Sequence, residues 1–353
     1  MSLEKLVGRF HPISAKGTGN ARTGRPGGLP EGVGPFACEC HILKWMYLRD
    51  FRFQQPESIE ETCNILDTTR DAVLLAGGTD LLVELKQGKR RHRDLVSLTR
   101  IPELKSIRLE EDRLSIGAGV THSQLMASPL VREHWPVIGE AAATIASEQV
   151  RNAATVGGNL CTAASCSDTA PILIALGAEL ELVSSRQTRV APVQGFFVSH
   201  RETVLQQGEV LTRILVPLPT PGSGACYEKF GLREAASIAV ASVAARVEMA
   251  GEVCAAACLV MGAVAPTPWV SHNAAELIEG KPAAELTGDQ RLLQRVGEAA
   301  AADAEPIDDI RGSAEYRRAL IAVLVPRTLL GALRRAEEAN RSNGGASGVG
   351  EPE

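Results

Sequence analysis

Two pairs of adjacent glycines are the residues whose spacing most directly suggests ligand chemistry. Gly77 and Gly78 follow one apolar segment, and Gly157 and Gly158 follow another. We expect a sharp turn at each pair, the second over 155–160. Glycine lets backbone amides approach a pyrophosphate closely, and successive amides can form a nest for an anion. A hydroxyl donor, Thr79, stands beside the first pair. The two segments therefore indicate a phosphate-containing cofactor, although tight turns without a ligand would also use such glycines.

The surroundings of these glycines lack two common nucleotide-binding motifs. Neither segment contains the GxGxxG of a Rossmann turn or the GxxxxGK[ST] of a phosphate loop, so both the nicotinamide-dehydrogenase and the nucleotide-hydrolase motifs are missing. The stretch 151–171 instead concentrates hydroxyl and amide side chains among Gly, Ala and Ser. Such a stretch can lie against a flat ligand.

Length and composition limit the class of protein. A chain of 353 residues suits two or three compact units, because single cores rarely grow past roughly 250 to 300 residues. The net charge of -5 gives no electrostatic argument for nucleic acid, and we interpret the basic run at 89–93 as a solvated loop between two strands. The longest apolar run, at 253–265, has 13 residues, whereas a bilayer needs about 20. We expect a buried strand there and no membrane span.

The eight cysteines bear on compartment and metal binding. They contain no CxxC pair and no signal-peptide core precedes them, which indicates a reducing cytoplasm. Cys38 and Cys40 flank one glutamate, and three alanines separate Cys254 from Cys258. Cluster binding is therefore an alternative to burial, but small apolar neighbours favour an inert core cysteine. We expect no metal site.

Local patterns place helices and strands around the glycine pairs. The expected elements are a helix up to 69 capped by Ser58, a buried strand at 72–76, a helix at 80–87, a hairpin around 110–112, paired strands at 238–249 and 253–264, and helices at 290–302 and 313–339. Pro326 should kink the last helix unless a helix end falls there. Proline and glycine crowd together at 217–224, which indicates a domain boundary. The segments 1–45 and 341–353 are expected to be disordered.

Three segments resemble one known family. They are Ala76-Gly77-Gly78-Thr79-Asp80-Leu81-Leu82, Thr155-Val156-Gly157-Gly158-Asn159-Leu160-Cys161 and Ser167-Asp168-Thr169-Ala170-Pro171. Together they look like the FAD-binding (medium) subunit of the molybdenum hydroxylase or xanthine dehydrogenase family, which includes the carbon monoxide dehydrogenase flavoprotein subunit. The resemblance runs from about Met46 to Ala339. The first 45 residues lie outside it.

The resemblance implies a set of FAD-binding residues and no catalytic residue in this chain. In the family, the first glycine segment wraps the FAD pyrophosphate, and Asp168 matches the carboxylate that binds the ribityl or ribose portion. Leu211 and Lys229 match positions beside the isoalloxazine ring, where a cation would favour the reduced anionic flavin. The implied cofactor-binding residues are Leu75, Ala76, Gly77, Gly78, Thr79, Asp80, Leu81, Thr155, Gly158, Asn159, Thr162, Asp168, Leu211 and Lys229.

The resemblance also implies an α+β fold and a set of boundaries. A two-subdomain FAD-binding domain of the vanillyl-alcohol-oxidase (PCMH) type would occupy 46–221, with subdomains at about 46–100 and 101–221. A C-terminal α/β-sandwich domain, like that of the CO dehydrogenase flavoprotein, would follow at 222–340.

The same resemblance implies partners. A large subunit would hold a molybdopterin cofactor, and a small subunit would hold [2Fe–2S] clusters, in a cytoplasmic dimer of heterotrimers. This chain would pass electrons to an external acceptor such as NAD or a quinone. It lacks the four-cysteine insertion of the 4-hydroxybenzoyl-CoA reductase subunit between Ile116 and Gly157, so we expect no [4Fe–4S] cluster in it. The alternatives are a stand-alone FAD-dependent oxidoreductase and a non-catalytic nucleotide-binding scaffold.

Overall fold

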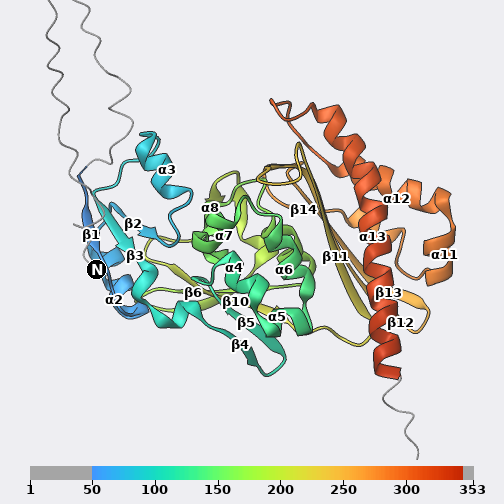
Figure 1. Cartoon of the computed structure of the whole chain (residues 1–353), viewed down its shortest axis with the longest axis horizontal. Coiled ribbons are helices and arrows are strands. Elements are labelled where there is room, and N and C mark those ends of the chain that lie inside the picture. Colours follow the sequence, from blue (N-terminus) through green and yellow to red (C-terminus); the bar gives the residue numbers. More distant parts are fainter. Residues whose placement is uncertain (1–49, 345–353) are drawn as a thin grey trace, which may run out of the picture. The chain divides into compact units, whose positions relative to one another are not determined.

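The structure is a computed structural model that describes residues 50–344, with side chains described up to residue 341. The expected extension at 1–45, including Cys38 and Cys40, lies outside the described residues, as do positions 345–353 of the expected tail. The described strands form sheets of three, five and four strands and a two-stranded ribbon, with helices packed against them (Figure 1). Within 50–344, no helix is both long and apolar enough to span a membrane.

The first layer is a three-stranded parallel sheet in the order β1-β3-β2. Its elements are β1 (Arg52–Gln54), α2 (Ile59–Thr68), β2 (Ala72–Leu75), α3 (Leu81–Lys86) and β3 (Asp94–Ser97). The expected cap of α2 is confirmed, since Glu61 N donates to Ser58 Oγ at 3.1 Å. The expected full burial of the strand at 72–76 is wrong, because β2 lies at the sheet edge and is half-buried throughout. The side chains of this edge strand are therefore free to form one wall of a cavity.

The second layer is a five-stranded antiparallel sheet in the order β4-β5-β10-β6-β7. Its strands are β4 (Ile107–Glu110), β5 (Arg113–Gly117), β6 (Glu179–Val183), β7 (Thr188–Pro192) and β10 (Val210–Pro217). The expected hairpin around 110–112 is confirmed, because β4 and β5 are paired on either side of it. A two-stranded ribbon joins β8 (Phe197–Ser199) and β9 (Glu202–Thr203). Short 3-10 turns are η2 (Leu98–Arg100), η3 (Pro102–Lys105) and η4 (Val193–Gly195).

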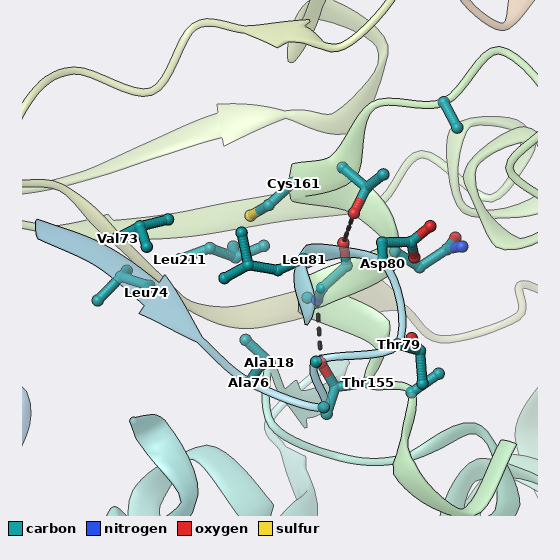
Figure 2. Close-up of a pocket in the computed structure, with 18 of the residues that line it drawn as sticks. Val73, Leu74, Ala76, Thr79, Asp80, Leu81, Ala118, Thr155, Cys161 and Leu211 are labelled. Carbon is teal, nitrogen blue, oxygen red and sulfur yellow. Dashed lines mark hydrogen bonds between the residues drawn. The ribbon is translucent and has the colours of Figure 1, made fainter. Parts of the chain in front are cut away.

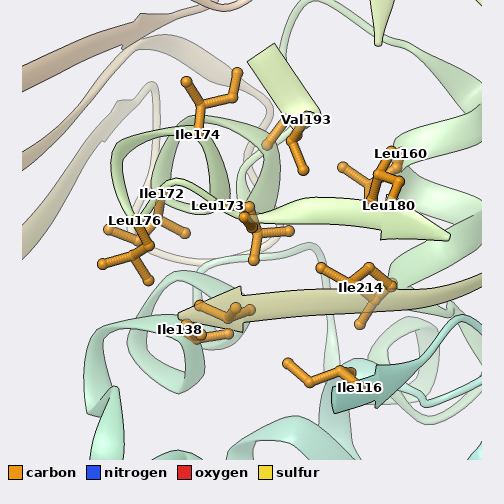
Figure 3. Close-up of a cluster of buried hydrophobic side chains, with 14 of the residues drawn as sticks. Ile116, Ile138, Leu160, Ile172, Leu173, Ile174, Leu176, Leu180, Val193 and Ile214 are labelled. Atoms are coloured by element: carbon orange, nitrogen blue, oxygen red, sulfur yellow. The ribbon is translucent and has the colours of Figure 1, made fainter. Parts of the chain in front are cut away.

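Short helices connect β5 to β6. They are α4 (His122–Ala127), α5 (Pro129–His134), α6 (Pro136–Ala143), α7 (Glu148–Ala153), α8 (Val156–Thr162) and α9 (Thr169–Ala175). Every residue of α9 is buried. Figure 3 shows Leu173 of α9 beside Leu180 of β6 and Ile214 of β10, all of them fully buried. Burial of each such side chain stabilises the fold by roughly 1.5–3 kcal/mol, so α9 is a firm anchor for the segments that precede it.

The last layer is a four-stranded antiparallel sheet, β11-β12-β13-β14, with helices on it. Its elements are β11 (Ser223–Gly231), β12 (Ala239–Ala250), β13 (Val253–Gly262), β14 (Trp269–Val270), α10 (His272–Glu276), α11 (Ala283–Gly288), α12 (Gln290–Asp303) and α13 (Ala314–Gly344). The expected pairing of 238–249 with 253–264 is confirmed by β12 and β13. The long helix α13 packs on β11 and β12 and against α12 (Figure 1).

Helix α13 has no end at Pro326 and continues past the expected end at 339 to Gly344. Two glycines allow its close packing. A Cβ at Gly224 of β11 would lie 2.1 Å from Ala332 O, and one at Gly297 of α12 would lie 2.2 Å from Ala322 O. These tight contacts on two sides help to hold the helix together despite the hydrogen bond that an internal proline removes.

Candidate cofactor site

A cavity of about 700 Å³ brings the two glycine segments together. Figure 2 shows Val73 and Leu74 of β2 on one side, with Thr155 and Cys161 of the second segment among the other lining residues. The expected residues that line the cavity are Ala76, Gly77, Gly78, Thr79, Asp80, Leu81, Thr155, Gly158, Asn159, Thr162, Asp168 and Leu211. Leu75 and Lys229 do not line it. The volume and the mixture of apolar walls with a few polar groups are typical of a cofactor site.

One glycine of each pair is required by packing within the protein. A Cβ at Gly77 would lie 2.0 Å from Ala153 O, so only glycine allows the first segment to approach the end of α7. A Cβ at Gly157 would lie 2.6 Å from Ala118 Cβ, and the backbone amide of Gly157 donates to Ala118 O at 2.9 Å. Gly78 has a φ of +72°, which L side chains rarely adopt. These glycines are therefore needed for the packing of the cavity wall itself, independently of any ligand.

The second glycine pair lies in a helix, which corrects its interpretation as a turn. Thr155 caps α8, and its Oγ1 accepts from Gly158 N at 3.0 Å. Thr162 Oγ1 donates to Gly158 O at 2.8 Å. The capping bond makes up for the poor helix propensity of glycine. The amide of Gly158 is thus already bonded within the protein, and the Thr155 and Thr162 side chains also have internal partners.

Asn159 orders the chain after α8. Its Oδ1 accepts from Ser167 Oγ and from Thr169 Oγ1, each at 2.6 Å. These two bonds tie the turn that carries Asp168 to the helix that carries the second glycine pair. Some of the hydroxyl and amide side chains in the stretch 151–171 therefore bond to one another and fix the local backbone.

Asp168 belongs to a buried polar group with Tyr227 and Lys229 of β11. Its side chain is 9% exposed. Tyr227 OH donates to Asp168 Oδ1 at 3.0 Å, and Lys229 Nζ donates to Asp168 Oδ2 at 2.7 Å and to Thr144 O at 2.9 Å. Burial raises the pKa of Asp168, while the charge of Lys229 opposes that rise. Lys229 does not line the cavity itself but is bonded to Asp168, which does.

Sequence reasoning missed the role of Tyr227. Burial, followed by the nearby Asp168 charge, raises its pKa well above the usual value, so its hydroxyl stays protonated as a donor. Residues two apart on a strand point to the same face. The alternation of Tyr227 and Lys229 on one strand was a signal that could have paired them.

His122 was also missed. It lines the cavity and is fully buried. Among the described side chains, neither of its ring nitrogens has a hydrogen-bond partner. Burial, with a smaller contribution from the charge of Arg151, lowers the pKa of His122 to about 4. The imidazole is therefore neutral at neutral pH.

Two arginines and a glutamate belong to the lining of the cavity. Arg90 Nε pairs with Glu84 at 2.8 Å, and Arg201 also pairs with Glu84. All three residues line the cavity. The basic run at 89–93 connects helix α3 to strand β3, so the expected position between two strands is wrong. Its expected character as a surface segment agrees with its exposure.

The described cysteines do not share one environment. Cys63 and Cys254 are buried, whereas Cys161 is exposed and lines the cavity with Cys166. Within the described part of the chain, no three His, Cys, Asp or Glu side chains are grouped so that they could hold a metal ion.

Comparisons with known proteins agree with this architecture. The family described as the FAD binding domain in molybdopterin dehydrogenase matches residues 49–219, and the CO dehydrogenase flavoprotein C-terminal domain matches residues 225–332. The carbon monoxide dehydrogenase medium chain of Hydrogenophaga pseudoflava is 33% identical over 81% of this chain and 98% of its own length. A putative xanthine dehydrogenase FAD-binding subunit of Escherichia coli K12 is 30% identical over 80% and 96%.

A solved structure is similar over nearly the same span. Carbon monoxide dehydrogenase from H. pseudoflava, in a form lacking the Mo-pyranopterin moiety of its molybdenum cofactor, has a TM-score of 0.77 at 32% identity. The alignment covers 83% of this chain and 99% of that one. The expected fold class, an FAD-binding domain followed by a C-terminal domain, is confirmed.

The fold and the cavity define a FAD-binding flavoprotein subunit of an oxidoreductase. The chain belongs to the xanthine dehydrogenase and CO dehydrogenase family, as a FAD-binding medium subunit. The residues of the cavity fit the flavin cofactor, since they combine a large apolar-walled volume with backbone that approaches closely at the glycines and buried hydrogen-bonding groups.

Proposed function

We propose that this chain binds one FAD non-covalently in the 700 Å³ cavity and acts as the electron exit of a multi-subunit complex. Its partners would be a large subunit with a molybdopterin cofactor and a small subunit with [2Fe–2S] clusters, arranged as a dimer of heterotrimers. The acceptor would be an external oxidant such as NAD or a quinone. The observation that carries the proposal is the convergence of both glycine segments on one cavity within the matched family region.

FAD suits this place because it exchanges single electrons with iron–sulfur centres and electron pairs with organic acceptors. The protein contributes binding, orientation and shielding. We assign the first glycine segment, 75–81, to the pyrophosphate, and Thr155, Gly158, Asn159 and Thr162 to the second wall of the site. Leu211, at the start of β10, and the residues just before it form a further part of the cavity wall.

Asp168 is the residue we assign to the FAD hydroxyls. A carboxylate oxygen can accept more than one hydrogen bond, so Asp168 can serve a ribose or ribityl hydroxyl while bonded to Tyr227 and Lys229. Lys229 holds the carboxylate in position and contributes a positive field from behind it. Its role toward the flavin is therefore exerted through Asp168.

We also propose that the chain divides near 217–224. The FAD-binding domain would be 46–221 and the C-terminal domain 222–340. The family matches end at 219 and begin again at 225, which supports this division. The bond from Lys229 to Asp168 connects the two proposed domains at the edge of the cavity.

Purification with native partners tests the function. We expect molybdenum, iron and flavin to copurify, and acid precipitation to release the flavin into the supernatant. Substrate should reduce the metal centres even after FAD is removed, while turnover with the terminal acceptor should require FAD. A flavoprotein that purifies alone and oxidises an organic substrate directly would instead support the stand-alone oxidoreductase, and flavin retained in the acid pellet would contradict non-covalent binding.

A further inference from the structure

A second, smaller cavity adjoins the cofactor cavity beside helix α3. It has a volume of about 220 Å³ and is lined by Glu84, Lys89, Arg90 and Arg201. All of these except Lys89 also line the cofactor cavity, so the two cavities share part of their walls. Three of the four residues are cations and only one is an acid. The contacts proposed above give this basic cluster no role.

The end of α3 brings two of the cations together. Gly88 follows the capping residue of α3 and has a φ of +68°. The amide of Lys89 donates to Glu84 O at 3.0 Å, a bond that is typical of helix ends with a glycine in the left-handed conformation. The chain therefore turns back on the helix, and the side chain of Arg90 reaches Glu84.

The third cation comes from a distant segment. Arg201 lies in the turn between β8 and β9, and its φ of +63° is uncommon for a residue other than glycine. Its amide donates to Ala163 O at 2.8 Å, and Ala163 is the residue that ends α8. Arg201 is therefore fixed to the helix that carries the second glycine pair, while its side chain pairs with Glu84 behind the first glycine segment.

The two guanidinium groups keep donors for a ligand. Arg90 pairs with one carboxylate oxygen of Glu84 through Nε at 2.8 Å, and Arg201 pairs with the other oxygen through Nη1. A guanidinium has five N–H donors, so this pairing leaves most donors of each group unused. The two side chains are 41% and 37% exposed, so a molecule in the cavity can reach them.

The other acids of the cofactor cavity do not cancel the positive charge of this cluster. Asp168 and Glu209 line the cavity, but each is paired with a cation that does not line it. Burial raises the pKa of Asp80, and the charge of Arg201 acts against that rise. The charge of Arg201 therefore acts on the first glycine segment, to which we assign the FAD pyrophosphate.

We propose that Arg90 and Arg201, with Lys89 beside them, form a subsite for a diphosphate group at the edge of the cofactor cavity. The inference rests on the proposed function. Guanidinium groups suit phosphate because their planar N–H donors can bond two oxygens at once. The diphosphate belongs either to the bound FAD or to a second dinucleotide that exchanges electrons with it, and the experiment distinguishes these two sources.

Binding of FAD and of ADP by variants of the full-length chain tests the subsite. Arg90→Gln and Arg201→Gln each remove one positive charge, whereas Glu84→Gln removes the negative charge and keeps an oxygen that can accept from the guanidinium groups. Arg91→Gln is the matched control, because Arg91 is an exposed arginine of the same basic run that lines neither cavity. The measurements are the Kd for FAD of the FAD-free chain and the Kd for ADP of the FAD-loaded chain, each at low and high salt.

If FAD supplies the diphosphate, each of the two arginine variants should raise the Kd for FAD about tenfold at low salt and by a smaller factor at high salt. If a second dinucleotide supplies it, binding of FAD should stay unchanged and the Kd for ADP should rise by a similar factor. In both cases Glu84→Gln should leave the affected Kd level or lower it, because loss of a nearby anion favours an anionic ligand. Arg91→Gln should change neither Kd.

The opposite outcomes are equally specific. A loss of affinity in Glu84→Gln that equals the loss in the arginine variants would show that the ion pairs only hold α3, and it would overturn the inference. Arginine variants that bind FAD as the wild type does, with binding of ADP unchanged or absent throughout, would also overturn it. Absence of FAD binding in the wild-type chain would instead overturn the proposed function.

Discussion

Removing either partner of the buried Asp168–Lys229 pair should destabilise the protein, and the two losses should depend differently on pH. The side chains of Lys229 and Asp168 are 7% and 9% exposed, so neither partner is solvated when the other is lost. Breaking a buried pair by removing one partner typically costs about 3–5 kcal/mol. The remaining group can limit this cost by becoming neutral, and the cost of doing so depends on pH.

The magnitudes follow from the ordinary pKa values. After Lys229→Met, protonating Asp168 costs at most about 4 kcal/mol at pH 7 but only about 1.5 kcal/mol at pH 5, because each unit above the usual pKa of roughly 3.9 adds about 1.4 kcal/mol. Burial raises the pKa of Asp168, so protonation is the way in which the carboxyl avoids an unpaired buried charge once Lys229 is lost. After Asp168→Leu, the Lys229 ammonium remains buried without its carboxylate at both pH values, so acid brings no relief. Only Lys229→Met should therefore regain stability at pH 5.

Chemical unfolding of the full-length chain at pH 7 and pH 5, each variant against the wild type at the same pH, measures these differences. Tyr227→Phe is the control that removes a hydrogen bond to Asp168 without removing a charge, and it should cost about 1.5–3 kcal/mol at both pH values. The double variant Asp168→Leu/Lys229→Met should be more stable than the Asp168→Leu single variant, because no charge is left unpaired. An equal deficit for Lys229→Met at both pH values, or a double variant as unstable as the sum of the singles, would refute the reasoning.

Three further outcomes are expected. Gly77→Ala should lose most of its FAD and unfold at a lower temperature, since its Cβ would lie 2.0 Å from Ala153 O, whereas Gly288→Ala, which has open space, should keep full flavin content by absorbance. Folding lowers the pKa of His122 from 6.5 to about 4, so the FAD-free wild type should lose stability as the pH drops from about 6.5 toward 4. Urea unfolding should show that His122→Leu loses less stability over the same pH range. Deleting residues 1–45 should leave FAD content unchanged, because the family match begins at residue 49, and loss of flavin would contradict that boundary.

Local sequence determined the elements whose signals are short-range. The hairpin around 110–112 and the pairing of β12 with β13 follow from alternating patterns across tight turns. The Ser58 cap was readable from one residue type at one position. The two glycine segments were also identifiable as places of close backbone approach, and both of them line the cavity.

Other features were decided by tertiary packing. Glycine in a helix costs about 1 kcal/mol relative to alanine, so the sequence favoured a turn at 155–160. The structure forms helix α8 there because Thr155 caps it and Gly157 packs on Ala118. Likewise, the apolar composition of β2 indicated a buried strand, but its burial depends on its place in the sheet, and β2 lies at the edge.

The polar interior of the site could not be obtained from the sequence alone. Asp168 meets Tyr227 and Lys229 across 59 and 61 positions, and such long-range pairs depend on how α9 packs against β12 and β13. His122 carried no motif, and only its burial beside the cavity singles it out. The sequence alone determined which cofactor to expect, because its glycine segments resemble those of one FAD-binding family. Tertiary structure decided which side chains surround that cofactor, because burial and charge pairing arise only when distant segments meet.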